Sequence, residues 1–342
     1  MSFNSRLVII LFILFGLVSA FVYFKTSTPS NNLASVTETN AFQLIENKLN
    51  QEAIQPIPEE STTNPTKVLI GEKLFHDPNL SSDGTISCAS CHDLNKGGTD
   101  QKKLSIGVNN RKGSINTPTV FNAVFNFKQF WDGRASDLKT QAVGPLFAHH
   151  EMGNTSWNSI LSYLNNSKEY RLMFKELYPH PITQESFLDA LSEYGKSLTT
   201  PNSRFDKYLK GDSFALNTLE LEGYQLFKNQ GCISCHQGIN MGGNMFQKAG
   251  IFEAISEGEL GSWEGRYTIT QNENDKGLFK VPTLRNIALT APYFHDGTAE
   301  TLEDSVAVMG RAQLGTELTT EEVNKIVAFL KTLTGEYKQQ PL

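Results

Sequence analysis

The first half of this 342-residue chain contains the run Cys88-Ala89-Ser90-Cys91-His92, and the second half repeats it as Cys232-Ile233-Ser234-Cys235-His236. Each run places two thiols one helical turn apart and a histidine directly after the second thiol. A Cys-x-x-Cys-His run is the attachment signature of a c-type haem, whose vinyl groups bond the thiols and whose iron binds the histidine. We therefore expect two covalently bound haem c groups, with thioethers on Cys88, Cys91, Cys232 and Cys235 and with iron ligands in His92 and His236.

Two other uses of paired cysteines compete with haem. Four cysteines could bind zinc, and a Cys-x-x-Cys pair could act as a thioredoxin-like dithiol. Zinc ribbons bring their pairs together over short distances in the sequence, and zinc does not require a histidine after each second cysteine. A redox dithiol belongs to a strand–helix context, which the flanking sequence does not show. The repeated histidine therefore favours haem.

Length and composition bound the class of protein. The chain is long enough for two domains, 39% of its residues are hydrophobic, and its formal net charge is −6. This acidic balance argues against a nucleic-acid partner. It is compatible with a small, basic redox protein as partner.

The N-terminal 60 residues are set apart from the globular part. The stretch 7–24 is almost wholly apolar, which predicts a transmembrane anchor or a signal peptide over residues 1–25. Cleavage after Ala20 would define a signal peptide, but the apolar run continues to Phe24, and we favour an uncleaved anchor. Residues 26–60 are rich in Ser, Thr, Asn and Gln and predict a flexible linker. Either reading exports the globular part to the periplasm, and an uncleaved anchor tethers it to the inner membrane.

The globular part contains the same pattern twice. Gly71–Phe75 precedes the first motif, and Gly223–Phe227 precedes the second. Further on, the stretch 116–138 matches 280–302 at a constant offset of 164 residues (280 minus 116). Internal repetition of this kind predicts two similar units, each built around one haem.

The fold expected from this repeat is all-α, with two tandem cytochrome c-like domains. Apolar residues at helical spacing predict helices over 184–197 and 319–333, while strand signals are short and scattered. We place the domains at 61–205 and 206–342, with the connection between them in the stretch 202–214.

The two halves differ at the position of a possible sixth iron ligand. The second half offers Met309, and methionine opposite histidine raises the potential of a haem and closes its iron. Met309 could instead fill the core, and Met241 and Met245 are rival ligands that follow His236 closely. Subtracting the offset of 164 from 309 gives Pro145, which has no ligand atom. The first haem is therefore expected to be open on its distal side.

Polar residues near Pro145 suit peroxide chemistry. Glu151, with Gln141 nearby, could take a proton from one peroxide oxygen and return it to the other. The alternative for Glu151 is a solvated position in a loop. Trp131 occupies the place of His295 in the other half, where a tryptophan would shorten an electron path between the haem groups or would be a core aromatic residue.

A further set of motifs extends from about Pro65 to Gly335. In chain order these are Leu74-Phe75, Ile86-Ser87-Cys88, Cys91-His92, Gln129-Phe130-Trp131-Asp132-Gly133-Arg134, Glu151-Met152, Pro282-Thr283-Leu284-Arg285-Asn286, Pro292-Tyr293-Phe294-His295-Asp296-Gly297 and Met309-Gly310. In kind and in order they resemble the motifs of the bacterial di-haem cytochrome c peroxidases.

The resemblance implies an enzyme that reduces hydrogen peroxide to water. It implies a low-potential haem on His92, where peroxide reacts, and a high-potential haem on His236 and Met309, where electrons enter. The donor would be a small cytochrome c or a cupredoxin, and the enzyme would be a homodimer.

Further site residues follow from the resemblance. Gln141 and Glu151 match the family's distal acid–base pair, and Trp131 matches its tryptophan between the haem groups. The resemblance also implies a calcium ion between the haem groups, with hard oxygen ligands from Asn116 and from the carbonyls of Thr290 and Pro292.

One position departs from the family pattern. Many members carry a histidine after the first motif that blocks the peroxide-reacting iron until the other haem is reduced, and Val108 stands at that position here. Val108 has no donor atom. His149 and His150 could replace it only by displacing Glu151, and we expect His76 to pack or form a hydrogen bond before the motif. These residues predict a first haem that is open even when oxidised.

Two other functions compete with peroxide reduction. A relative that oxidises protein residues, as the methylamine dehydrogenase maturation enzymes do, would carry tyrosine in place of Met309. A pure electron carrier would need two six-coordinate irons, which Pro145 disfavours.

Overall fold

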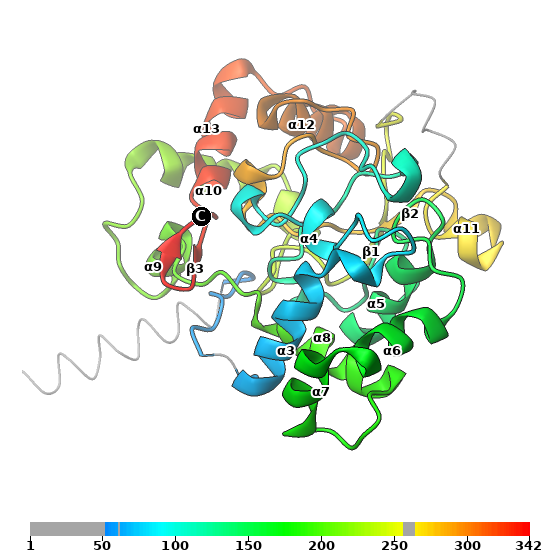
Figure 1. Ribbon diagram of the computed structural model, residues 1–342. Coiled ribbons are helices and arrows are strands. Elements are labelled where there is room, and N and C mark those ends of the chain that lie inside the picture. Colours follow the sequence, from blue (N-terminus) through cyan, green and yellow to red (C-terminus); the bar gives the residue numbers. More distant parts are fainter. Residues whose placement is uncertain (1–51, 61, 256–263) are drawn as a thin grey trace, which may run out of the picture. The chain divides into compact units, whose positions relative to one another are not determined.

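Helices dominate the computed structural model, which describes residues 52–60, 62–255 and 264–342 (Figure 1). The predicted anchor over 1–25 and the linker up to residue 51 lie outside the described residues. Within the described ranges, no helix combines the length and the hydropathy needed to cross a membrane.

The first half surrounds the first Cys-x-x-Cys-His motif with helices. They are α3 (Pro65–His76), α4 (Cys88–Cys91), α5 (Leu138–Phe147), α6 (Trp157–Asn166), α7 (Lys168–Lys175) and α8 (Gln184–Ser197). Short 3-10 turns lie between them: η1 (Pro78–Leu80), η2 (Leu94–Lys96), η3 (Val108–Asn110) and η4 (Ala123–Phe125). Helix α8 has the bounds that its apolar periodicity predicts.

The second half repeats this arrangement. Its helices are α9 (Arg204–Leu209), α10 (Thr218–Asn229), α11 (Tyr267–Thr270), α12 (Leu302–Val308) and α13 (Thr320–Lys331), with the turns η5 (Cys232–Ser234), η6 (Glu273–Asp275) and η7 (Ile287–Leu289) and the π-helical turn η8 (Met309–Gln313). Two short antiparallel pairs accompany them: β1 (Phe246–Lys248) with β2 (Leu278–Lys280), and β3 (Glu336–Tyr337) with β4 (Gln340–Pro341). The predicted all-α fold of two cytochrome c-like domains is confirmed.

Helix α9 lies within the stretch for which the sequence predicts a connection. Ser203 caps it, because the Asp206 N–H donates to the Ser203 hydroxyl at 3.0 Å and the Ser203 N–H donates to the Asp206 carboxylate at 3.1 Å. Phe205 packs edge-on against Tyr224 and Phe329. This helix therefore contributes to the core of the second half, and the boundary expected between 205 and 206 falls inside it.

The duplication is visible in the backbone. Asn122 and Asn286, which are 164 positions apart (286 minus 122), have φ values of 61° and 60°, a left-handed conformation that asparagine tolerates. Both side chains are fully buried. Their amide groups donate to the same hydroxyl, that of Thr200, at 2.7 and 2.9 Å. Equivalent residues of the two halves thus meet at one shared acceptor.

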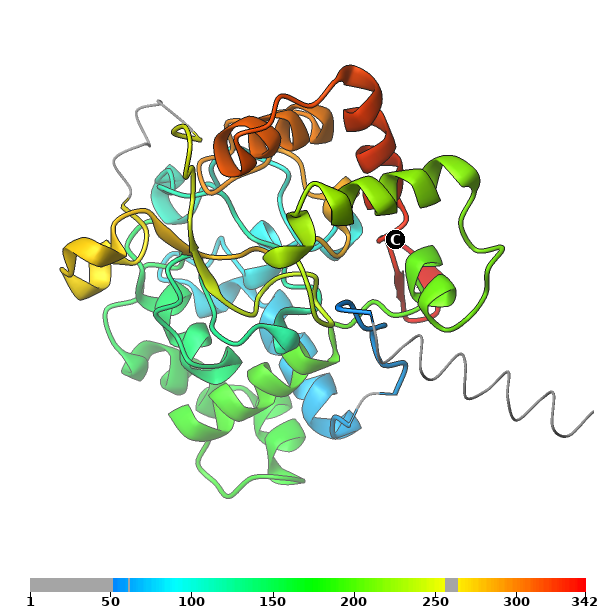
Figure 2. The same cartoon turned by 180° about the vertical axis from the view of Figure 1, so that it is seen from behind.

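In each half, a glycine allows two long helices to cross closely. Helix α3 packs against α8 and α10 packs against α13, as both views of the chain show (Figures 1 and 2). A Cβ on Gly71 would lie 2.2 Å from the Ala190 carbonyl oxygen, and one on Gly223 would lie 1.9 Å from the Lys325 carbonyl oxygen. Only glycine fits at either crossing.

Replacing Gly223 with alanine should destabilise the fold by about 1–3 kcal/mol, because the backbone of α13 must move to admit one methyl group. The midpoint of urea unfolding measures this. Gly195→Ala in α8 is the control, since its nearest neighbour, Leu138 Cδ1, would lie 3.3 Å from the new Cβ and alanine favours the helix. Equal midpoints for the two variants would contradict the expectation.

The described ends of the chain cross between the halves. Ile54 and Ile57, from the stretch predicted as a linker, are 1% and 0% exposed, and the Gly238 N–H donates to the Ala53 carbonyl at 2.8 Å. At the other end, Tyr337 packs against Phe121 of the first half with ring centroids 5.2 Å apart. Residues 52–57 thus belong to the folded second half, and the C-terminal residues cover the core of the first.

A buried ion pair fixes the first of these crossings. Arg285 Nη1 lies 2.8 Å from Asp206 Oδ1, and both side chains are fully buried. The remaining donors of Arg285 bind the carbonyls of Gln55 at 2.8 Å and Ile239 at 2.9 Å. Because these groups satisfy both charges, the pair can be buried without an orphaned ion.

Candidate active site and haem sites

The two Cys-x-x-Cys-His runs fold into the same turn. The His92 N–H donates to the Cys88 carbonyl at 2.9 Å, and the His236 N–H donates to the Cys232 carbonyl at 3.0 Å. Each turn therefore presents its two thiols one turn apart. All four cysteines are free, so each turn has both thiols available for the attachment of a haem c group.

The two candidate iron ligands are held in the same way. The Nδ1 atom of His92 lies 3.2 Å from the Gly98 carbonyl oxygen, and that of His236 lies 3.2 Å from the Met241 carbonyl oxygen. This contact assigns the proton to Nδ1 and leaves Nε2 for a metal. Burial lowers the pKa of both imidazoles, that of His236 to about 4. A neutral imidazole is the form that binds iron.

The structure disfavours the zinc and dithiol alternatives. Burial is the main cause that raises the pKa of the Cys88 thiol to about 12 and that of the Cys232 thiol to about 11, whereas reactive dithiols have a lowered pKa. Among the described residues, no group of three or more His, Cys, Asp or Glu side chains could hold a metal ion. The two cysteine pairs thus do not assemble into a four-cysteine zinc site.

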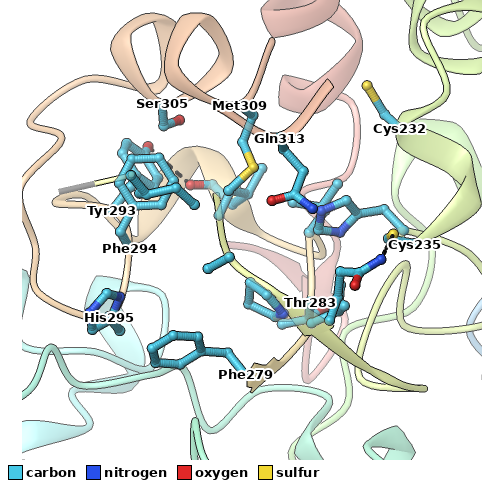
Figure 3. A pocket seen from close by; sticks show the side chains of 18 of the residues that line it. Cys232, Cys235, Phe279, Thr283, Tyr293, Phe294, His295, Ser305, Met309 and Gln313 are labelled. Carbon is cyan, nitrogen blue, oxygen red and sulfur yellow. Dashed lines mark hydrogen bonds between the residues drawn. The ribbon is translucent and has the colours of Figure 1, made fainter. Parts of the chain in front are cut away.

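A cavity of about 270 Å³ opens beside the second motif, with His236 and Met309 both in its lining. Figure 3 shows the sulfur of Met309 directed into this space. Met309 begins the π-helical turn that follows α12, a feature often found at functional sites. Of the methionines in the described ranges, Met309 lines the cavity, whereas the rivals Met241 and Met245 do not. The cavity is mainly apolar, as a porphyrin requires.

Trp131 and His295, which occupy equivalent positions in the two halves, face each other. Their ring centroids are 6.4 Å apart at 69°, and both residues line the second-half cavity. The indole N–H of Trp131 donates to the Asn116 carbonyl at 3.0 Å. Phe279 also packs against His295, with ring centroids 4.5 Å apart. Trp131 therefore extends from the first half to the edge of the second haem site.

Glu151 lies in the loop after α5, within electrostatic reach of the first motif. Burial is the main cause of the raised pKa of the Cys88 and Cys91 thiols, and the charge of Glu151 adds to it. Burial also raises the pKa of Glu151 itself, while His150 and Arg134 oppose the shift. The side chain is 40% exposed, and its carboxylate lies 3.9 Å from His150 Nε2. Its carboxyl group can therefore exchange protons beside the first haem site.

Helix α5 carries the other residues expected on this side. Gln141 is half-buried near its start. Pro145 lies in its last turn, where its carbonyl accepts the Met152 N–H at 3.1 Å. Pro145 therefore helps to hold the loop of Glu151, and its side chain has no atom that could bind an iron.

Val108 also holds the loop that carries Glu151. It is fully buried, its N–H donates to the Glu151 carbonyl at 2.9 Å, and a Cβ on Gly153 would lie 2.6 Å from Val108 Cγ2. The other histidines near this site are accounted for: His149 is exposed, and His76 packs on Phe75 and forms a hydrogen bond with the Glu72 carbonyl at 2.9 Å. The expectation for His76 is confirmed.

The residues expected to bind calcium lie around the second-half cavity. Asn116, Thr290 and Pro292 all line it. Asn116 is buried and uses its amide nitrogen for the Lys102 carbonyl at 2.9 Å. A cation here would therefore bind through the amide oxygen and backbone carbonyls.

Two charged residues at the haem sites escaped the sequence reasoning. Arg134 belongs to the quoted Phe130–Arg134 motif, and its guanidinium carbon lies 3.5 Å from the centroid of the Phe130 ring. Its positive charge lowers the pKa of Glu151, against the larger effect of burial. Lys280 lines the second-half cavity and is 7% exposed. Its alignment with Asn116 in the repeat was the one available signal, because a single lysine otherwise indicates a surface position.

The chain is similar to known proteins over almost its whole described length. The sequence profile of the di-haem cytochrome c peroxidases matches residues 65–214, and that of cytochrome c matches 221–334. Cytochrome c551 peroxidase of Nitrosomonas europaea is 48% identical over 83% of this chain and 85% of its own length. Cytochrome c peroxidase Ccp of Escherichia coli is 49% identical over 84% of this chain, which spans 62% of that relative.

Solved structures agree on the fold. A MauG-like protein associated with microbial copper homeostasis superposes with a TM-score of 0.72 at 28% identity, covering 83% of this chain and 93% of that one. The diheme peroxidase BthA of Burkholderia thailandensis superposes with a TM-score of 0.67 at 20% identity, covering 82% and 88%. Together with the two haem-attachment turns, these similarities show that the chain belongs to the di-haem cytochrome c peroxidase family.

Proposed function

We propose that this protein reduces hydrogen peroxide to two water molecules at the first haem site and receives the two electrons through the second. The observation that carries the proposal is the asymmetry of the repeat: Met309 lines the second cavity, whereas the equivalent Pro145 offers no ligand. When bound, the haem groups held by His92 and by His236 with Met309 would supply the redox chemistry. The chain supplies the acid–base groups and the spacing between the two sites.

Proton transfer is the part assigned to Glu151, with Gln141 of α5 as its proposed partner. The Glu151 carboxylate accepts a proton from one peroxide oxygen and returns it to the leaving oxygen. His150 and solvent can restore the proton balance, since the carboxylate is 40% exposed and 3.9 Å from that imidazole. Trp131 supplies an aromatic bridge between the sites, supported by its contact with His295.

The remaining parts of the proposal concern the setting. A small cytochrome c or a cupredoxin donates the electrons, Asn116, Thr290 and Pro292 hold a calcium ion, and the enzyme is a homodimer. It acts in the periplasm, tethered by residues 1–25 or released by their cleavage. Peroxide-dependent oxidation of a reduced small cytochrome c tests the central claim, and a haem-loaded protein without this activity would contradict it. The maturation-enzyme alternative requires tyrosine where Met309 stands, and the carrier alternative requires a ligand where Pro145 stands.

The fully oxidised protein should react with peroxide without prior reduction. Val108 has no donor atom and is locked under the Glu151 loop, so nothing at that position can bind and release the iron. Stopped-flow mixing should show no lag, and electron paramagnetic resonance should show one high-spin and one low-spin haem. Two low-spin signals and a requirement for one electron would reveal another distal ligand, which His149→Ala, His150→Ala and His76→Ala would identify.

A further inference from the structure

Lys280 carries a buried charge for which the described part of the chain provides no counter-ion. The residue ends strand β2 and is 7% exposed, although lysine is almost never buried unless it is paired. Burial alone lowers the pKa of Lys280 to about 8, and no carboxylate within the described ranges opposes the shift. Burying an ammonium ion without a partner is unfavourable. The residue is therefore placed for an anion that arrives from outside the chain.

The cavity beside Lys280 is the second haem site. Lys280 lines it together with Phe279, which precedes it in β2, and with His295. Figure 3 shows Cys232 and Cys235 on one side of this space and Phe279 and His295 on the opposite side. In haem c the two vinyl carbons bonded by cysteine lie on one edge of the porphyrin, and the two propionate chains leave the opposite edge. The carboxylates of a bound haem would therefore leave on the side of Phe279 and His295, and Lys280, next to Phe279 in the chain, is part of the same lining.

We propose that the Lys280 ammonium group binds a propionate carboxylate of the haem attached at Cys232 and Cys235 and thereby raises the reduction potential of that haem. The propionates are the anions that the cofactor itself brings into the cavity, and their pairing with Lys280 satisfies both buried charges. A positive charge near the porphyrin also favours the reduced iron, which carries one positive charge fewer. The proposal depends on haem attachment and not on the peroxide chemistry.

Of the two equivalent positions in the repeat, only the one in the second half is a lysine. Its equivalent in the first half is Asn116 (280 minus 116 gives the offset of 164), which is neutral. The two residues form reciprocal bonds: the Asn116 N–H donates to the His295 carbonyl at 2.8 Å, and the Lys280 N–H donates to the Trp131 carbonyl at 2.8 Å. Because the backbones match and the side chains differ in charge, Lys280 raises the potential of the second haem relative to the first.

Replacement of Lys280 tests the charge directly. In haem-loaded protein, Lys280→Gln should shift the reduction equilibrium of the second haem at least about tenfold toward the oxidised form, a fall of about 59 mV for one electron, and leave the first haem nearly unchanged. Lys280→Arg keeps the charge and should restore most of the potential. Lys331→Gln is the matched control, because this lysine of α13 is 60% exposed and solvent screens its charge. Spectroelectrochemical titration measures both haems.

Two outcomes would overturn the proposal. One is a second-haem potential in Lys280→Gln equal to that of Lys331→Gln. The other is a potential in Lys280→Arg as low as that in Lys280→Gln. A crystal structure of the unmodified haem-loaded protein is independent of any variant's folding: it should place Lys280 Nζ within about 3 Å of a propionate oxygen, and a separation beyond hydrogen-bond distance would also refute the pairing.

Discussion

Glu151→Gln is expected to lower peroxide turnover by at least about 10²-fold while both haem groups remain attached, because positioned proton transfer supplies about 10²–10⁴-fold in rate. Glutamine keeps the size of the side chain and its polarity but cannot accept and return a proton. The backbone of Glu151, whose carbonyl accepts the Val108 N–H at 2.9 Å, is unaffected by the change. The loop should therefore keep its place, and the loss should fall on turnover.

The pH profile separates this role from a structural one. Since burial raises the pKa of Glu151, its carboxylate form is lost at a higher pH than that of an ordinary glutamate as the solution is acidified. Turnover should fall through that pKa in the native enzyme, and Glu151→Gln should lack this acid limb. Glu169→Gln on α7, where the carboxylate is 65% exposed, is the control. Near-native activity in Glu151→Gln would contradict the role in proton transfer and would indicate that Glu151 is a solvated glutamate in a loop.

Met309→Ala is expected to lower the potential of the second haem by well over the about 59 mV that corresponds to a tenfold change. Axial ligands set haem potentials over a range of roughly 0.8 V, and this variant would remove the thioether proposed as the sixth ligand, which favours the reduced iron. Turnover with an electron donor should slow for the same reason. The direct reaction of the oxidised protein with peroxide should change little, since Met309 lies in the other half.

Met245→Ala provides the comparison for this variant. Met245 is half-buried in the same half but does not line the cavity, so its loss should leave the potential of the second haem nearly unchanged. Spectroelectrochemical titration of the second haem measures the potential directly. If Met309→Ala left the potential of the second haem where it was, Met309 would be a core residue and another ligand would be required.

The sequence predictions that the structure confirms rest on patterns within short stretches of sequence. The spacing within each Cys-x-x-Cys-His run predicts one helical turn, and both runs form it. The apolar periodicity over 184–197 predicts α8, and that over 319–333 predicts α13. The helices pack around each motif as the repeat predicts. Both halves contain amphipathic helices and a glycine at the helix crossing, Gly71 in the first half and Gly223 in the second.

Features that depend on distant partners could not be predicted in this way. The stretch around Ile54 is polar enough to suggest a linker, and it is held in the fold by residues far along the chain, among them Arg285, which donates to the Gln55 carbonyl, and Gly238, which donates to the Ala53 carbonyl. Helix α9 is too short for periodicity to reveal it. Lys280 has an ordinary sequence context, and its importance follows from its burial against a cavity that the second half builds from several segments.

The exchange of chain ends between the halves bears on how such a protein could change over generations. A gene that encodes one half alone would lack residues that the other end of the chain supplies. The first half would lose Tyr337, and the second would lose Ile54 and also Ile57, whose N–H donates to the Asp206 carboxylate at 3.2 Å. A deletion that returned the duplicated gene to a single copy would therefore expose part of a core. The crossing of the two ends makes the doubling difficult to reverse, and the two haem sites are inherited together.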